Sequence, residues 1–298
     1  MKIKFAAASP FFGLAFTVLA SGPVEADDDA ILIEPTWKVG KQYTCEHNQD
    51  VVITLGQGDQ ALENPVKFSV TFEVEVSANG KKGEKALAFR ATKTKMSMNL
   101  FGQEFEYDSE DKEKQSPDVS AMLEGIVNTG DLKVIFDKDD KFLRFEGGEK
   151  SAEAGTAPGV PTIRFGNNEI RQILAYCVRS FPDHPVKKGD KWSTEETVNL
   201  NLGSVDVKMN MTAKGANDKG RPLVDYESKI DVRFPEGGLA AGGQGKGKME
   251  GEMTYDPEKA VIVEHVTATK MTVDMSGLPV PVKQSAKTTV VKVEDVEK

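Results

Sequence analysis

The chain has 298 residues, with 38 basic side chains against 47 acidic ones and a net charge of −9 at neutral pH. This acidic balance disfavours nucleic acid and anionic membrane surfaces as partners, because both attract clusters of Lys and Arg. The length suffices for one large domain or two small ones, each with a hydrophobic core.

The first 26 residues have the organisation of a secretory signal peptide. Two lysines precede an apolar run over 5–20, and Val-Glu-Ala at 24–26 places small residues at the −3 and −1 positions of a cleavage site. The apolar run is shorter than a membrane span, which needs about 20 residues. We therefore expect cleavage between Ala26 and Asp27 and an exported chain, either periplasmic or extracellular.

Membrane attachment of the exported chain is not expected. Gly22 occupies the position at which a lipoprotein signal would carry its lipid-bearing cysteine. No later stretch of the sequence is long and apolar enough to form a transmembrane helix. We therefore expect neither a lipid anchor nor an integral membrane segment.

Beyond the leader, apolar and polar residues alternate in several segments, which predicts antiparallel strands with one solvated face. In 67–76, for example, Phe and Val occupy every second position. Turn signals such as Asn79-Gly80 separate these segments. The predicted strands include 67–76, 87–98, 205–211, 223–234, 248–255 and 284–293.

Two features occur in the same order in both parts of the chain. A glycine turn leads to a strand that opens on an aromatic residue, first Tyr43 and later Trp192. An acidic turn then joins two strands, first at 136–142 and later at 255–261. If the parts are related folds, both aromatic rings should be buried at corresponding places.

This repeat divides the chain into a signal peptide (1–26), a first β-rich half (27–150), a small-residue linker (151–162) and a second β-rich half (163–298). Apolar stripes at helical spacing predict one helix after Ser116 and another over about 168–181. We predict a mainly β fold: antiparallel sheets in two related halves, as a curved sheet, a sandwich or an open barrel, with two covering α-helices.

Two cysteines are present, Cys45 and Cys177. An oxidising compartment favours a disulfide between them, while two separately buried thiols are the alternative. Cys45 shares strand parity with Tyr43, and Cys177 lies on the apolar stripe of its helix, so both side chains should point inward. The sequence leaves the pairing open.

The sequence contains no complete catalytic, metal or cofactor motif. The glycine-rich segment 242–248 has the spacing of a phosphate loop, but Met249 stands where the motif needs Ser or Thr, and a strand follows instead of a helix. We read 237–247 as a hairpin connection. A zinc site drawn from Cys45, His47, Cys177 and His184 lacks the second half of a zinc signature.

Charged side chains are concentrated in predicted turns. The carboxylates at 137, 139, 140, 256 and 258 are placed where aspartate favours a turn by bonding its own backbone. The lysines at 81, 82 and 85 are read as a solvated turn. We therefore predict no cofactor and no catalytic residue.

Two stretches carry a resemblance to a known family. One runs from Gly130 to Gly147, and the other, 181–192, contains a proline-flanked Gly-Asp-x-Trp. Together they resemble a domain-of-unknown-function family of exported bacterial proteins, domain of unknown function 6263. The resemblance implies a helix before a strand-turn-strand unit and a second half entered through Gly-Asp-x-Trp. It implies no activity and no functional residues.

Three functional hypotheses follow from the sequence. The first is a non-enzymatic exported protein with a binding or envelope-associated structural role. The second is a carrier of a lipid or another apolar ligand in a cavity enclosed by the sheet, favoured by methionines on the predicted strands at 96, 98, 209, 211, 271 and 275. The third is a hydrolase whose site assembles from distant residues.

Overall fold

The computed structural model describes residues 30–56, 61–81, 83–100, 102–127, 129, 132–147, 170–171, 174, 181–200, 203–233, 243–275 and 277–296. The predicted signal peptide with its Ala26–Asp27 cleavage site, the linker 151–162 and Cys177 lie outside the described residues. Among the described residues, no helix has the length and apolar character needed to cross a membrane.

The strands are β1 (Lys41–Leu55), β2 (Leu62–Ala78), β3 (Lys85–Leu100), β4 (Gln103–Asp108), β5 (Asp111–Gln115), β6 (Lys133–Phe136), β7 (Phe142–Glu146), β8 (Lys191–Leu200), β9 (Gly203–Ala216), β10 (Pro222–Arg233), β11 (Gln244–Asp256), β12 (Val261–Met275) and β13 (Leu278–Asp295), and the helix α1 is Pro117–Val127.

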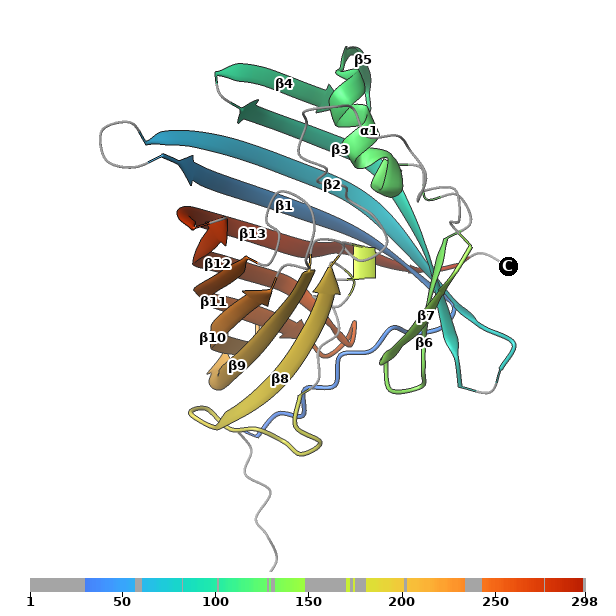
Figure 1. The fold of residues 1–298 in the computed structure, drawn as a ribbon. Coiled ribbons are helices and arrows are strands. Elements are labelled where there is room, and N and C mark those ends of the chain that lie inside the picture. Colours follow the sequence, from blue (N-terminus) through green and yellow to red (C-terminus); the bar gives the residue numbers. More distant parts are fainter. Residues whose placement is uncertain are drawn as a thin grey trace, which may run out of the picture.

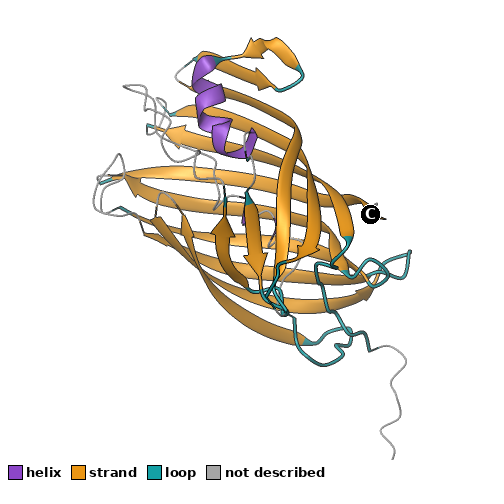
Figure 2. Ribbon diagram, turned by 90° about the vertical axis from the view of Figure 1, so that its right-hand side faces the viewer, coloured by secondary structure: helices purple, strands orange, loops and turns teal. Residues whose placement is uncertain are grey.

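All these strands belong to one antiparallel sheet in the order β5-β4-β3-β2-β1-β13-β12-β11-β10-β9-β8, with β6 pairing β3 and β7. The two parts of the chain meet where β1 pairs with β13, from Lys41 opposite Asp295 to Ile53 opposite Val282. The sheet is curved but not closed into a barrel (Figures 1 and 2). The predicted mainly β, antiparallel fold is confirmed, and of the three predicted forms the curved sheet is the observed one.

The two faces of the sheet differ because the sequence alternates. In β2, Phe68, Val70, Phe72, Val74 and Val76 are all buried, while the residues between them are half-buried or exposed. We call the face that carries these side chains the inner face. Each side chain fully buried in this way stabilises the fold by about 1.5–3 kcal/mol.

The helix α1 covers the inner face beside β3 and β4 (Figure 1). Its buried Val119, Leu123 and Ile126 pack into the core of β1–β4. The Ser116 carbonyl accepts the Ser120 N–H at 2.9 Å, as expected for the residue that caps the helix.

The second predicted helix falls largely outside the described residues. Its described members Ile170, Arg171 and Leu174 are helical. Ile170 and Leu174 are buried in the same core as α1. The guanidinium carbon of Arg171 lies 4.3 Å from the centre of the Phe142 ring on β7, an arrangement in which the cation is attracted to the ring face.

The two glycine turns are structurally equivalent. Gly40 and Gly189 both have positive φ, 81° and 94°, a conformation that favours glycine. The N–H of Gly40 donates to the Val76 carbonyl and that of Gly189 to the Ala213 carbonyl, both at 2.8 Å. Each turn is thus fastened to the strand that neighbours the strand it opens.

The aromatic residues after these turns differ in burial. Tyr43 is 0% exposed, and its ring lies edge-on to that of Trp37 with 4.7 Å between the ring centres. The Tyr43 Oη accepts a hydrogen bond from the Lys38 N–H at 3.0 Å. Trp192 is half-buried, because it lies on the edge strand β8 with one neighbouring strand. The expectation of two buried rings is correct for Tyr43 and wrong for Trp192.

Candidate binding face

Strand register places residues of widely separated segments in rows across the inner face. His47 on β1 is opposite Val70 on β2 and Thr288 on β13, and Thr288 is opposite His265 on β12. Directly opposed residues of antiparallel strands point to the same side of the sheet. His47, Thr288 and His265 therefore form part of one row.

The polar members of this row are hydrogen-bonded. His47 Nδ1 lies 2.9 Å from Thr288 Oγ1, and His265 Nε2 lies 2.8 Å from Tyr226 Oη. Both histidines are almost inaccessible, 3% and 2% exposed. Burial lowers the pKa of His47, opposed by a hydrogen bond to Gln49, because a charged imidazolium loses its hydration in the interior.

A glycine makes the Tyr226–His265 contact sterically feasible. Gly251 on β11 lies between Tyr226 on β10 and the strand of His265, and a Cβ added to it would lie 2.5 Å from Tyr226 Oη. The phenol ring occupies the space that a side chain at Gly251 would fill. An aromatic side chain covering a cross-strand glycine is a recurrent stabilising device in sheets.

Beyond this row, towards the other ends of the strands and beside the buried Val273 and Val280, a group of apolar residues of the inner face is only half-buried. We call them the apolar strip: Val51, Ile53, Val66, Met249, Met271 and Val282. Ile53 is opposite Val282, and Val282 is opposite Met271. Val51 is opposite Val66 on β2. The strip therefore runs across β2, β1, β13, β12 and β11 without a charged side chain in these pairs.

The methionines predicted to line a cavity are mostly core residues. Met96, Met98, Met209 and Met211 are buried. Met271 belongs to the apolar strip, and the side chain of Met275 lies outside the described ones. Met249 is not among the methionines named from the sequence, although it lies in the predicted strand 248–255, and β11 begins earlier, at Gln244.

Other residues singled out from the sequence are separate in space. Cys45 is buried on the inner face, as predicted, and Cys177 lies outside the described residues. His184 is exposed, with Nδ1 3.3 Å from Asp183 Oδ1. Gly245 and Gly247 lie within β11, so the segment with phosphate-loop spacing is a strand there. Among the described residues, no group of three or more His, Cys, Asp or Glu side chains is arranged to hold a metal ion.

The interpretation of the lysine turn needs one correction. Lys81 is exposed, and Lys82 lies outside the described residues. The side chain of Lys85, however, is only 13% exposed and pairs at 2.9 Å with Asp140, which is itself 7% exposed. The Lys85 ammonium also donates to Thr36 Oγ1 at 2.8 Å. This cluster joins the segment before β1 to β3 and the β6–β7 turn.

Comparison with solved structures gives distant likenesses. Lipovitellin, from a structure titled for its lipid–protein interactions, matches with a TM-score of 0.49 and 10% identity over 88% of this chain. This chain spans 26% of the lipovitellin chain. The translocator domain of autotransporter NalP from Neisseria meningitidis matches with a TM-score of 0.22 and 9% identity, over 86% of this chain and 90% of that one. A BenF-like porin from Pseudomonas fluorescens Pf-5 matches with a TM-score of 0.22 and 6% identity, over 87% of this chain and 100% of that one.

No curated protein matches the chain. A family model does match part of it, over 100 of the 298 residues. The match begins before β8 and ends within β12, so it covers the Gly-Asp-x-Trp entry and most of the second half of the sheet. Of the two stretches that carry the resemblance, 181–192 lies within the match and 130–147 lies outside it. The family to which residues 163–262 are similar is the Family of unknown function (DUF6263), the family named from the sequence.

Proposed function

We propose that this chain is an exported binding protein rather than an enzyme, and that it carries an apolar ligand against the inner face of its sheet. The observation that supports the proposal most directly is the apolar strip: half-buried aliphatic and methionine side chains on the inner face, of which Ile53, Val282 and Met271 are directly opposite one another. Covering such surface with an apolar ligand is favourable by about 25 cal/mol per Å² removed from water.

The composition of the strip suits a ligand chain of variable shape. Met249 and Met271 are unbranched and adapt to irregular apolar surfaces. Gly247, opposite Met271, contributes no side chain, and Met271 packs over it. The row that joins Val51 to Met249 also contains Gln284 and Thr269, which are polar but uncharged.

The hydrolase hypothesis is less well supported. The Thr288 hydroxyl lies within hydrogen-bonding distance of the His47 imidazole, which is the contact a nucleophile needs with its base. Both residues are only 3% exposed, however, so a substrate cannot approach them without opening the core. We interpret this pair as a structural hydrogen bond.

Ligand binding is tested with a fluorescent fatty acid, dansyl-undecanoate, whose emission rises in apolar surroundings. We expect saturable binding by the parent chain and weaker binding by Met271→Glu, because the introduced carboxylate would lie on the apolar strip. Thr272→Glu is the matched control, since Thr272 is the next residue of β12 and is exposed on the opposite face. Equal binding by all three chains would refute the assignment of the ligand to the inner face.

The proposed export is tested separately from ligand binding. Cleavage after Ala26 would give exported material that begins at Asp27, which N-terminal sequencing detects directly. Native mass spectrometry of the same material would show an endogenous apolar ligand as added mass. Exported protein that retains Met1 would contradict the signal-peptide assignment while leaving the binding proposal intact.

A further inference from the structure

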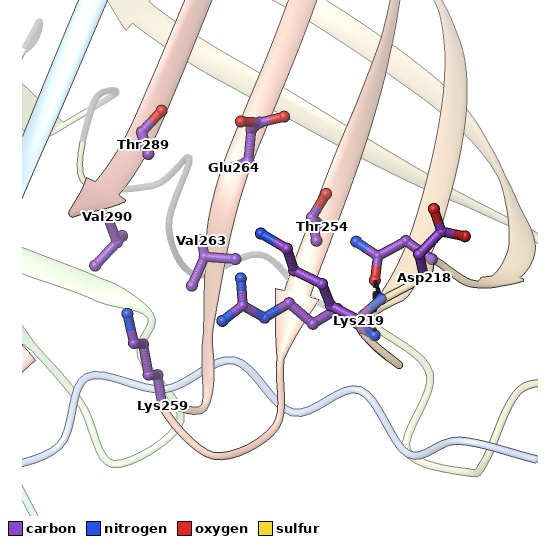
Figure 3. A pocket seen from close by; sticks show the side chains of 10 residues that line it. Asp218, Lys219, Thr254, Lys259, Val263, Glu264, Thr289 and Val290 are labelled. Atoms are coloured by element: carbon purple, nitrogen blue, oxygen red, sulfur yellow. Dashed lines mark hydrogen bonds between the residues drawn. The ribbon is translucent and has the colours of Figure 1, made fainter. Parts of the chain in front are cut away.

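Two hairpin turns form a pocket of about 320 Å³ beside β12 and β13 (Figure 3). Its basic side chains are Lys219 and Arg221, from the β9–β10 turn, and Lys259, from the β11–β12 turn. Thr254 and Thr289 add hydroxyl groups. We propose that this pocket is a binding site for a phosphate group, independent of the apolar ligand of the inner face.

The backbone that carries the lysines is fixed by side-chain caps. Asn217 Oδ1 accepts the N–H groups of Lys219 and Arg221, both at 3.0 Å. Asp256 Oδ1 accepts those of Glu258 at 3.0 Å and Lys259 at 3.1 Å. Because both turns are held in this way, the positions from which the lysines extend are set before any ligand binds.

The charge of the pocket is incompletely neutralised. Arg221 pairs with Asp256 at 2.8 Å, and the Glu264 carboxylate in the lining pairs with Lys287 at 2.6 Å. Neither Lys219 nor Lys259 forms an ion pair with any described residue. In Figure 3 Lys219 extends towards Val263 and Lys259 towards Val290, from different turns, whereas the Asp218 carboxylate points away from them.

Another hollow, of about 390 Å³ beside β2–β4, provides a comparison. There Lys95 pairs with Asp108 at 2.6 Å and Lys114 with Glu106 at 3.6 Å, so two of the three lysines that line it have anionic partners. Lys219 and Lys259 instead have no anionic partner among the described residues, and Arg221 beside them is held by Asp256. An anion in the pocket would supply the missing counter-charge.

Phosphate is the anion whose chemistry the pocket fits best. Lysine ammonium groups act on it as mobile point charges, arginine offers a planar fork of donors, and threonine hydroxyls donate to further oxygens. The group can belong to a free phosphate ester or to the headgroup of an anionic phospholipid. Both sources present the same phosphate oxygens to Lys219 and Lys259.

Residue-specific acetylation of the unmodified protein tests the site without mutation. We expect inorganic phosphate, at matched ionic strength, to slow acetylation of Lys219 and Lys259 in the native chain. Lys246 and Lys248, exposed on β11 outside the pocket, should react at an unchanged rate. Equal rates with and without phosphate at all four lysines would overturn the proposal.

A pair of variants gives a second, independent readout by calorimetric titration with inorganic phosphate. Lys219→Gln/Lys259→Gln should bind about tenfold more weakly or worse, because it loses two charge-assisted hydrogen bonds. Lys246→Gln/Lys248→Gln removes the same charge elsewhere and should bind as the parent does. An equal loss in both double variants would show general electrostatic attraction and refute a built site.

Vesicles distinguish the two sources of the phosphate group. Co-sedimentation with phosphatidylglycerol vesicles but not with phosphatidylcholine vesicles, lost in Lys219→Gln/Lys259→Gln, would support the site and assign it to a lipid headgroup. Phosphate protection without sedimentation would support the site and assign it to a free ester. Sedimentation that persists in this double variant, without phosphate protection in the parent, would place anion binding elsewhere and refute the proposal.

Discussion

Tyr226 Oη on β10 and His265 Nε2 on β12 are hydrogen-bonded at 2.8 Å across the strand that separates them. The bond passes over β11 at Gly251. Glycine leaves room there for the phenol ring, because it has no Cβ. Two strands that do not pair with each other are thereby joined on the inner face.

We predict that Gly251→Ala destabilises the fold. The new Cβ would lie 2.3 Å from the Val266 carbonyl oxygen and 2.5 Å from Tyr226 Oη, so the strand or the ring must move. The free energy of unfolding should fall by about 1–3 kcal/mol, the range for overpacked sites. Urea denaturation measures it, with the exposed neighbour Glu252→Ala as a control expected within about 0.5 kcal/mol of the parent.

The burial of His47 predicts loss of stability in mild acid. Burial lowers the pKa of His47 in the folded chain, so below about pH 6.5 the unfolded chain binds the proton more readily. The free energy of unfolding should therefore decrease as the pH falls from about 6.5 through the lowered pKa. His47→Gln should flatten this dependence, and the exposed His184→Gln should leave it unchanged. Parallel pH profiles for the parent and His47→Gln would contradict the prediction.

Tyr43 and Trp192, the aromatic residues near the starts of β1 and β8, should contribute differently to the free energy of unfolding. Tyr43→Ala removes a fully buried ring and should cost about 3–5 kcal/mol. Trp192→Ala removes a half-buried ring at the sheet edge, 6.0 Å from Phe181, and should cost about 1–3 kcal/mol. Chemical denaturation of both variants compares them directly. A larger loss at Trp192 would show that the edge strand is anchored more strongly than its burial indicates.

The two acidic turns provide a matched pair of capping residues. Asp137 Oδ1 accepts the N–H groups of Asp139 and Lys141 at 2.9 Å, and Asp256 caps its turn in the same manner. Asp256 also pairs with Arg221 and is 4% exposed. Asp256→Ala should cost about 2–3 kcal/mol against about 1 kcal/mol for Asp137→Ala, because it also leaves a cation without its partner. Equal losses in thermal unfolding would mean that the ion pair contributes nothing.

Cys45 should resist thiol reagents in the native protein, because its side chain is 0% exposed. We expect labelling of Cys45 only after denaturation, as judged by peptide mass spectrometry. Mild reduction then separates the two predicted states of the cysteines: a loss of thermal stability indicates a disulfide with Cys177, and an unchanged transition indicates two buried thiols. Rapid native labelling of Cys45 would contradict the inward placement.

Much of the local structure follows from the sequence. Alternation in 67–76 predicts the strand, its inner face and its burial, because a strand with one dry face must alternate. Ser116 and Pro117 predict the start of α1, since both residues favour the first turn of a helix. The β4–β5 hairpin was not predicted, because β5 has no apolar residue and the alternation in β4 is limited to Phe105 and Tyr107.

Local pattern did not predict the long-range assembly. Gln244–Gly247 was read as a connection because glycine disfavours strands, yet its neighbours Met271 and Val273 on β12 pack over the glycines and keep the segment extended. Lys85 was read as solvated because a lysine among charges in a turn usually is, and its burial depends on Asp140 and Thr36, residues distant in the chain.

The sequence by itself determined the antiparallel strands, the inward residues and the repeated turns, because each is encoded by neighbours within a few positions. Only the tertiary structure decided that the two halves share one sheet, that Met249 and Met271 join Ile53 and Val282 in an apolar strip, and that Lys219 and Lys259 meet at one pocket. These arrangements depend on the pairing of β1 with β13 and of successive hairpins in register. Such pairing is set by the packing of the whole inner face and not by any one segment.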